Sequence, residues 1–296
     1  MADPSKSTAS ARLLLPRALV STLMRFYDVP HPRRPARIIR GYDRPHAVRT
    51  ARMCAAVALR LGHPPARVVR YQIACLLHDL GRAGLDRRLF GKIWSWAKQH
   101  GIPTRPREWR AVYPDTRYGC ETEAFLKLYA GDLGRAGIHL DAWAQEQIEM
   151  RLGYARRLKR RLRAVRPQLM ALGVPWSPWM GTIMLYYYYP EKLAEATPWV
   201  KQLAEILVAC EQFEAYSNRQ RGGDYYVRRR ETLVEAFEYL EKLRREGMVS
   251  AAVMETLRVL AAEGVFDAIV AESRGTALSK EERRYLKEMA TGAACR

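Results

Sequence analysis

The most informative part of the sequence is Ala74-Cys75-Leu76-Leu77-His78-Asp79-Leu80-Gly81-Arg82. A mostly apolar run leads into a histidine and an aspartate at the end of an expected buried helix. Polar groups in such a place need a hydrogen bond, an ion pair or a metal ion. Imidazole and carboxylate are common ligands of divalent cations, so the pair suggests a metal site. The alternative interpretation is a core histidine capped by the neighbouring aspartate.

A second histidine upstream favours the metal site. His46 begins an expected helix that continues to Gly62, and a second helix then runs to Leu77. The short connection over residues 63–65 makes the two helices antiparallel neighbours. The start of the first helix then lies beside the end of the second, which predicts that His46 lies near His78 and Asp79.

These residues resemble the HD superfamily of metal-dependent phosphohydrolases, and within it the HD-GYP branch. The resemblance is carried by His46 with Arg49, by the leucine-rich approach to His78-Asp79, and by residues 81–85, where the family has Gly-Lys-Ile-Gly-Ile. A second block over residues 206–217 matches as well, with Glu211 where the family has a metal-binding aspartate and with Arg219 just beyond. Together the matches cover residues 40–92 and 200–265.

Two parts of the chain depart from the family pattern. Tyr113 stands where the family has a metal-binding histidine, and a phenol with a pKa near ~10 is a poor ligand at neutral pH. Residues 176–190 lack the family's His-His-Glu cluster and its Gly-Tyr-Pro signature. Either Tyr189-Pro190 is the remnant of that signature, or the tyrosines at 186–189 replace the histidines. The resemblance therefore implies one metal ion rather than two or three, or none.

The resemblance implies an all-α fold, an HD-domain helical bundle with additions. We expect an N-terminal tail and helix over residues 1–40, an HD-GYP-like domain over 41–272, and a C-terminal tail helix over 273–296. Within the domain, residues 139–175 form a basic helical insertion without a clear family counterpart. Three prolines in residues 29–35 predict a linker, and no strand of convincing length is expected.

The function implied by the resemblance is hydrolysis of cyclic di-GMP or another nucleotide phosphodiester, with iron or manganese as the cofactor. The predicted metal ligands are His46, His78, Asp79 and Glu211, and a bound cation would activate water as the nucleophile. Asp79 and Arg82 are candidate catalytic residues. Candidate clamps for the phosphodiester are Arg49, Arg82 and Arg219. The alternative is a catalytically inactive module that binds cyclic di-GMP, a protein partner or nucleic acid.

The charge balance adds a second set of candidate partners. A formal net charge of +19 attracts nucleic acid, anionic lipid or phosphorylated ligands, unless it reflects an arginine-favouring genome. The segment from Arg151 to Arg166 is the most basic, and it predicts either contact with nucleic acid or an acidic protein, or a solvated face of a packed helix. Its cations are Arg151, Arg156, Arg157, Lys159, Arg160, Arg161, Arg163 and Arg166.

The remaining composition predicts a cytoplasmic protein. No apolar run reaches the ~18 residues that a membrane span requires. The five cysteines show no CxxC pairing, and Cys54, Cys75 and Cys210 stand in apolar helical contexts, which favours free thiols in a reducing compartment.

Overall fold

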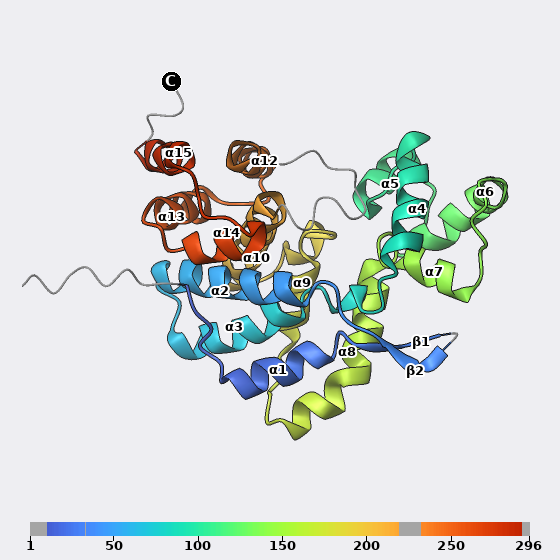
Figure 1. Ribbon diagram of the computed structural model, residues 1–296, viewed down its shortest axis with the longest axis horizontal. Helices are drawn as coiled ribbons and strands as arrows, with labels where there is room; N and C mark the ends of the chain where they lie inside the picture. Colours follow the sequence, from blue (N-terminus) through green and yellow to red (C-terminus); the bar gives the residue numbers. More distant parts are fainter. Residues whose placement is uncertain (1–10, 33, 219–231, 292–296) are drawn as a thin grey trace, which may run out of the picture.

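The computed structural model describes residues 11–32, 34–218 and 232–291. Within these ranges the chain is helical apart from one two-stranded sheet, which confirms the predicted all-α class (Figure 1). The α-helices are α1 (Arg17–Arg25), α2 (Arg44–Arg60), α3 (Pro65–Leu77), α4 (Arg87–Gln99), α5 (Pro106–Val112), α6 (Glu121–Arg135), α7 (Ala142–Glu149), α8 (Tyr154–Ala171), α9 (Pro178–Leu185), α10 (Pro198–Ser217), α12 (Leu233–Arg245), α13 (Ala251–Ala262), α14 (Asp267–Arg274) and α15 (Lys280–Ala290). Two 3-10 helices cover Leu80–Arg82 and Pro190–Leu193.

Helices α2, α3 and α10 form the centre of the molecule. Helices α2 and α3 pack along each other as an antiparallel pair, and α10 packs against α2. Each of the three has a proline in its first turn, where the missing N–H costs no helical hydrogen bond. Their facing sides are fully buried, as at Met53, Leu76 and Ile206. This packing fixes the ends of α2 and α3 relative to each other.

The N-terminal segment is tied to α3 by hydrogen bonds that are buried or partly buried. The Leu14 N–H donates to Gln72 Oε1 at 2.7 Å, and Gln72 Nε2 donates to the Arg12 carbonyl at 3.2 Å. The Tyr27 hydroxyl donates to the Leu76 carbonyl at 2.8 Å. The predicted N-terminal helix therefore braces the end of α3 that carries His78.

The buried apolar residues form two separate clusters. The larger runs from α1 through α3 and from α8 to α15. The smaller lies among α4 to α7 and is centred on Trp94, Trp109 and Phe125. Figure 1 shows α4 to α7 set apart from α12 to α15, with α8 running below them.

The linker predicted for residues 29–35 is a β-hairpin instead. Strands β1 (Val29–His31) and β2 (Arg34–Ile39) pair antiparallel, with Val29 opposite Ile39. A two-stranded ribbon has only edge strands, so prolines whose nitrogens face outward remove no ladder hydrogen bond. The prediction failed because it treated the prolines as strand breakers.

The predicted basic helical insertion is split, and no membrane helix is present in the described ranges. The insertion, expected over residues 139–175, is interrupted over residues 150–153, between α7 and α8. None of the helices built from described residues is both long and apolar enough to cross a membrane. Cys54, Cys75, Cys120 and Cys210 are free thiols, as predicted, and Cys295 lies outside the described residues.

Candidate metal centre

The antiparallel pair α2–α3 brings His46, His78 and Asp79 together, as predicted. His46 lies in the first turn of α2, His78 follows the last residue of α3, and Asp79 precedes the 3-10 helix Leu80–Arg82. One ligand atom from each residue lies within 4.8 Å of the others. All three side chains are buried, so water cannot easily satisfy their polar atoms.

The atoms that face one another have the chemistry of a cation site. Asp79 Oδ2 lies 3.7 Å from His46 Nε2 and 3.9 Å from His78 Nε2, and both distances are too long for hydrogen bonds. Neither Nε2 has a hydrogen-bond partner within the described part of the chain. Buried polar atoms without partners are rare, and a cation between these three atoms would satisfy both nitrogens at once.

The other nitrogen of each imidazole is held by an acceptor. His78 Nδ1 donates to the Cys75 carbonyl at 2.6 Å, and His46 Nδ1 donates to a carboxylate oxygen of Glu214. A hydrogen bond from Nδ1 places a hydrogen on that nitrogen, so the lone pair of the neutral ring lies on Nε2, which is the arrangement of a metal-ligating histidine. Both rings are therefore oriented with their lone pairs toward Asp79.

Glu214 is a functional candidate that the sequence reasoning missed. It comes from α10 and is fully buried, and its Oε1 accepts from Arg49 Nε at 2.7 Å and from Asn218 Nδ2 at 3.0 Å. One signal in the sequence could have found it. Glu214 follows the buried Leu207 and Cys210 at spacings of seven and four residues, so a carboxylate occupies the apolar row of the helix.

Glu211 lies near the three ligands without joining them. It lines a small cavity together with His78 and Asp79, but its carboxylate is not in the group whose ligand atoms lie within 4.8 Å. The side chain is half-buried, whereas Glu214 is fully buried. The assignment of Glu211 as a fourth ligand stays a prediction.

The predicted arginine clamps have different surroundings. Arg82 lies beside two carboxylates, with Nε 3.4 Å from Asp43 Oδ2 and a terminal nitrogen 3.6 Å from Asp79 Oδ2. Arg49 is buried and bonded to Glu214, on the side of the His46 ring opposite Nε2. Arg219 lies outside the described residues. The roles of all three toward a substrate stay predictions, and Arg49 positions Glu214.

Helix α8 supports the turn that follows the His78-Asp79 pair. The Tyr154 hydroxyl donates to the His78 carbonyl. Fully buried Arg157 donates from Nε to the Gly81 carbonyl at 2.7 Å and from a terminal nitrogen to the Ala83 carbonyl at 2.8 Å. A Cβ at Gly81 would lie 2.7 Å from the Tyr154 ring, so the close approach of α8 requires glycine.

The basic segment is therefore partly used inside the molecule. Arg157 also pairs with Glu146 at 2.7 Å, Arg160 pairs with Glu149 at 2.7 Å, and Arg156 approaches Glu149 at 3.0 Å. These pairs give that part of the segment a structural role that needs no external phosphate. Cations that remain exposed and form no ion pair within the described ranges are Lys159, Arg163 and Arg166.

The tyrosines that the family resemblance would align with histidines lie in two places. Tyr113 packs on Trp109 with ring centroids 4.4 Å apart and shares a hydrogen bond with Tyr129, so it belongs to the smaller apolar cluster. Tyr187 and Tyr188 line the cavity beside the metal centre. Burial raises the pKa of Tyr187 well above its usual value, so its phenol stays neutral and is a poor metal ligand.

No protein-family model, curated protein or solved structure matches this chain. The resemblance to HD-GYP proteins consequently remains a prediction from the residues that carry it. The candidate metal centre is supported by its own geometry.

Proposed function

We propose that this protein is a metal-dependent phosphohydrolase that acts on a nucleotide phosphodiester, with cyclic di-GMP as the substrate implied by the family resemblance. The observation that carries the proposal is a pair of buried atoms, His46 Nε2 and His78 Nε2, which both lie near Asp79 Oδ2 and have no hydrogen-bond partner among the described residues. No apolar core gains from such an arrangement, because each unsatisfied buried nitrogen costs about 1–3 kcal/mol.

Each residue of the candidate metal centre would have its own role in the reaction. His46, His78 and Asp79 would hold one divalent cation, which would supply Lewis-acid activation at a phosphoryl group. Iron and manganese suit mixed imidazole and carboxylate ligands. Glu214 would keep the His46 ring in its ligating orientation. The Arg82 guanidinium, beside Asp79, would oppose the negative charge that develops on a phosphate.

Metal content and phosphodiesterase activity of matched variants test the proposal. We expect the purified protein to bind about one equivalent of iron or manganese and to hydrolyse cyclic di-GMP or a nitrophenyl phosphodiester. His46→Ala and Asp79→Asn should lose both properties. His100→Ala is the control, because this exposed histidine hydrogen-bonds only within its own helix turn. A protein that stays metal-free and inactive after incubation with both metals would contradict the proposal.

A catalytically inactive binding module is the second candidate, and the size of the cavity favours it. The cavity at His78 and Asp79 has a volume of about 10 Å³, and Tyr154, Tyr187 and Tyr188 are among the residues that line it. That space fits one water or one ion, not a phosphate ester. Hydrolysis therefore requires this cavity to widen. Full metal content combined with no turnover, and heat of binding with cyclic di-GMP, would establish the binding module.

A further inference from the structure

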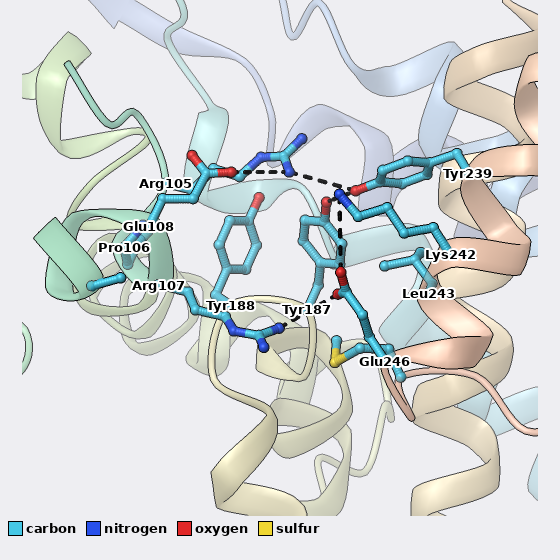
Figure 2. Close-up of a pocket in the computed structure, with 12 residues that line it drawn as sticks. Arg105, Pro106, Arg107, Glu108, Tyr187, Tyr188, Tyr239, Lys242, Leu243 and Glu246 are labelled. Carbon is cyan, nitrogen blue, oxygen red and sulfur yellow. Dashed lines mark hydrogen bonds and ion pairs between the residues drawn. The ribbon is translucent and has the colours of Figure 1, made fainter. Parts of the chain in front are cut away.

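A second, larger cavity adjoins the metal centre. It has a volume of about 270 Å³, and we call it the tyrosine pocket (Figure 2). Tyr187 and Tyr188 line this pocket and also line the small cavity that contains His78 and Asp79. The tyrosine pocket and the cavity at the candidate metal centre therefore share two walls, Tyr187 and Tyr188.

The aromatic walls of the pocket are held in place from behind. Tyr188 stacks on Tyr154 with ring centroids 4.5 Å apart, and Tyr239 stacks on Tyr216 at 4.8 Å. The Tyr187 and Tyr239 hydroxyls share a hydrogen bond of 2.7 Å. Rigid aromatic walls offer a planar ring a surface on which to pack at little cost in side-chain entropy.

The mouth of the pocket carries an excess of positive charge. Arg105 lies 3.4 Å from Glu108, while Arg107 and Lys242 lie 3.7 Å and 3.9 Å from the same carboxylate, that of Glu246. Three cations thus face two carboxylates. Because both contacts to Glu246 are longer than hydrogen bonds, the N–H groups of Arg107 and Lys242 remain available to an anion. Figure 2 shows both side chains directed toward Glu246 at the edge of the pocket.

The volume limits what the pocket can hold. Pockets for drug-sized ligands span about 300–1,000 Å³, so this one takes a single nucleoside-sized group and not a whole dinucleotide. Apolar side chains line the rest of it, among them Ala111, Leu243 and Met248. Aromatic walls, one net positive charge and nucleoside size together define the ligand class.

We propose that the tyrosine pocket binds a planar organic anion of nucleoside size, such as a nucleoside monophosphate. The ring would pack against Tyr187, Tyr188 and Tyr239, and the anionic group would accept hydrogen bonds from Arg107 and Lys242. This inference rests on the proposed phosphohydrolase function. The ligand would be the part of the substrate that lies away from the reacting phosphorus. Binding energy from such a remote part can be used to orient the reacting group.

Calorimetry on the full chain, freed of metal by a chelator, tests the pocket separately from the chemistry. The probes are AMP, adenosine and ribose 5-phosphate. We expect AMP to bind, and each of the other two to bind at least about tenfold more weakly, because each lacks either the anion or the ring. The double variant Arg107→Ala/Lys242→Ala should weaken AMP binding by about tenfold. Both side chains are more than half exposed, so the variant should fold.

Controls separate this proposal from the function on which it rests. Arg163→Ala removes an exposed cation elsewhere and should leave AMP binding unchanged. His78→Ala should lose metal and keep AMP binding, whereas the double variant should keep metal. The proposal that this pocket binds a nucleoside monophosphate would be overturned if AMP did not bind at millimolar concentration. Equal affinities for AMP and adenosine would overturn it too, as would a double variant with unchanged AMP affinity. The metal content of the same samples reports on the metal centre independently.

Discussion

At the scale of single residues, the position of one carboxylate explains the orientation of the candidate metal centre. Glu214 is fully buried, yet it accepts hydrogen bonds from His46, Arg49 and Asn218. A buried charge is tolerated only when it is paired and hydrogen-bonded, and here the cation of Arg49 fulfils the first condition. The imidazole is thereby fixed by a group that does not itself reach the cation site.

Glu214→Gln should weaken metal binding without removing a ligand. An amide can accept from His46 but carries no charge, so the basicity of the ring falls, and loss of such outer partners costs about 10–100-fold in metal affinity. Competition against a chromophoric chelator measures the change. Glu238→Gln, on the exposed side of α12, is the control. Unchanged affinity in Glu214→Gln would show that His46 is not a ligand.

Glu121 provides a prediction about pH. Burial raises the pKa of this carboxyl, whose two oxygens lack hydrogen-bond partners among the described residues although Arg110 Nε lies 3.5 Å away. A carboxyl with a raised folded-state pKa binds its proton more tightly in the folded protein. Stability is therefore lost as pH rises from the unfolded pKa, about 4.3, through the folded value.

Glu121→Gln should accordingly be more stable than the natural protein at pH 7, with the difference vanishing near pH 4. Urea denaturation at the two pH values measures it. Glu123→Gln, an exposed change in the same helix turn, should show no comparable gain. A less stable Glu121→Gln at pH 7 would mean that the attraction of Arg110 outweighs the cost of burial.

At the scale of secondary-structure elements, α8 acts as a brace for the turn after Asp79. Arg157→Ala would remove the donor of the Gly81 and Ala83 carbonyls and the nearer of the two arginines that pair with Glu146. We expect a loss of about 3–5 kcal/mol in the free energy of unfolding, because two buried hydrogen bonds from a charged donor disappear and each contributes about 1.5–3 kcal/mol. Arg163→Ala, on the exposed side of α8, should change it by less than about 0.5 kcal/mol. If urea denaturation showed equal losses of stability for Arg157→Ala and Arg163→Ala, α8 would not act as a brace.

The elements show which features follow from local sequence. The predicted C-terminal tail helix contains α15, which starts with a capping box of Ser279 and Glu282, a signal that needs only four adjacent residues. The pairing of α2 with α3 could also be predicted from local sequence, since a short connection leaves two helices few arrangements other than antiparallel packing. Glu214 was missed because its partner His46 is 168 residues away. The internal use of Arg157 was missed for the same reason, because periodicity cannot say which neighbour a helix face meets.

At the scale of the whole molecule, the excess of positive charge has a measurable consequence. Lys159, Arg163 and Arg166 remain exposed, and they supply the surface on which the prediction of nucleic-acid binding now rests. If they contact phosphates, affinity for duplex DNA falls steeply with salt, with a slope of about −0.9 per contact. Replacing all three by alanine should flatten the slope by about three. An unchanged slope in a filter-binding series would place the contacts elsewhere.

The arrangement of α2 and α3 also bears on the order of assembly. His46, His78 and Asp79 all come from one helical hairpin of adjacent sequence, whereas Glu214 arrives with α10. Local contacts form sooner than distant ones, because less chain entropy is lost in making them. We therefore expect a nascent chain to capture its ion loosely once residue 79 has emerged, and to retain it firmly only after α10 docks. Pulse-labelling hydrogen exchange during refolding, with and without manganese, would reveal early protection confined to α2 and α3.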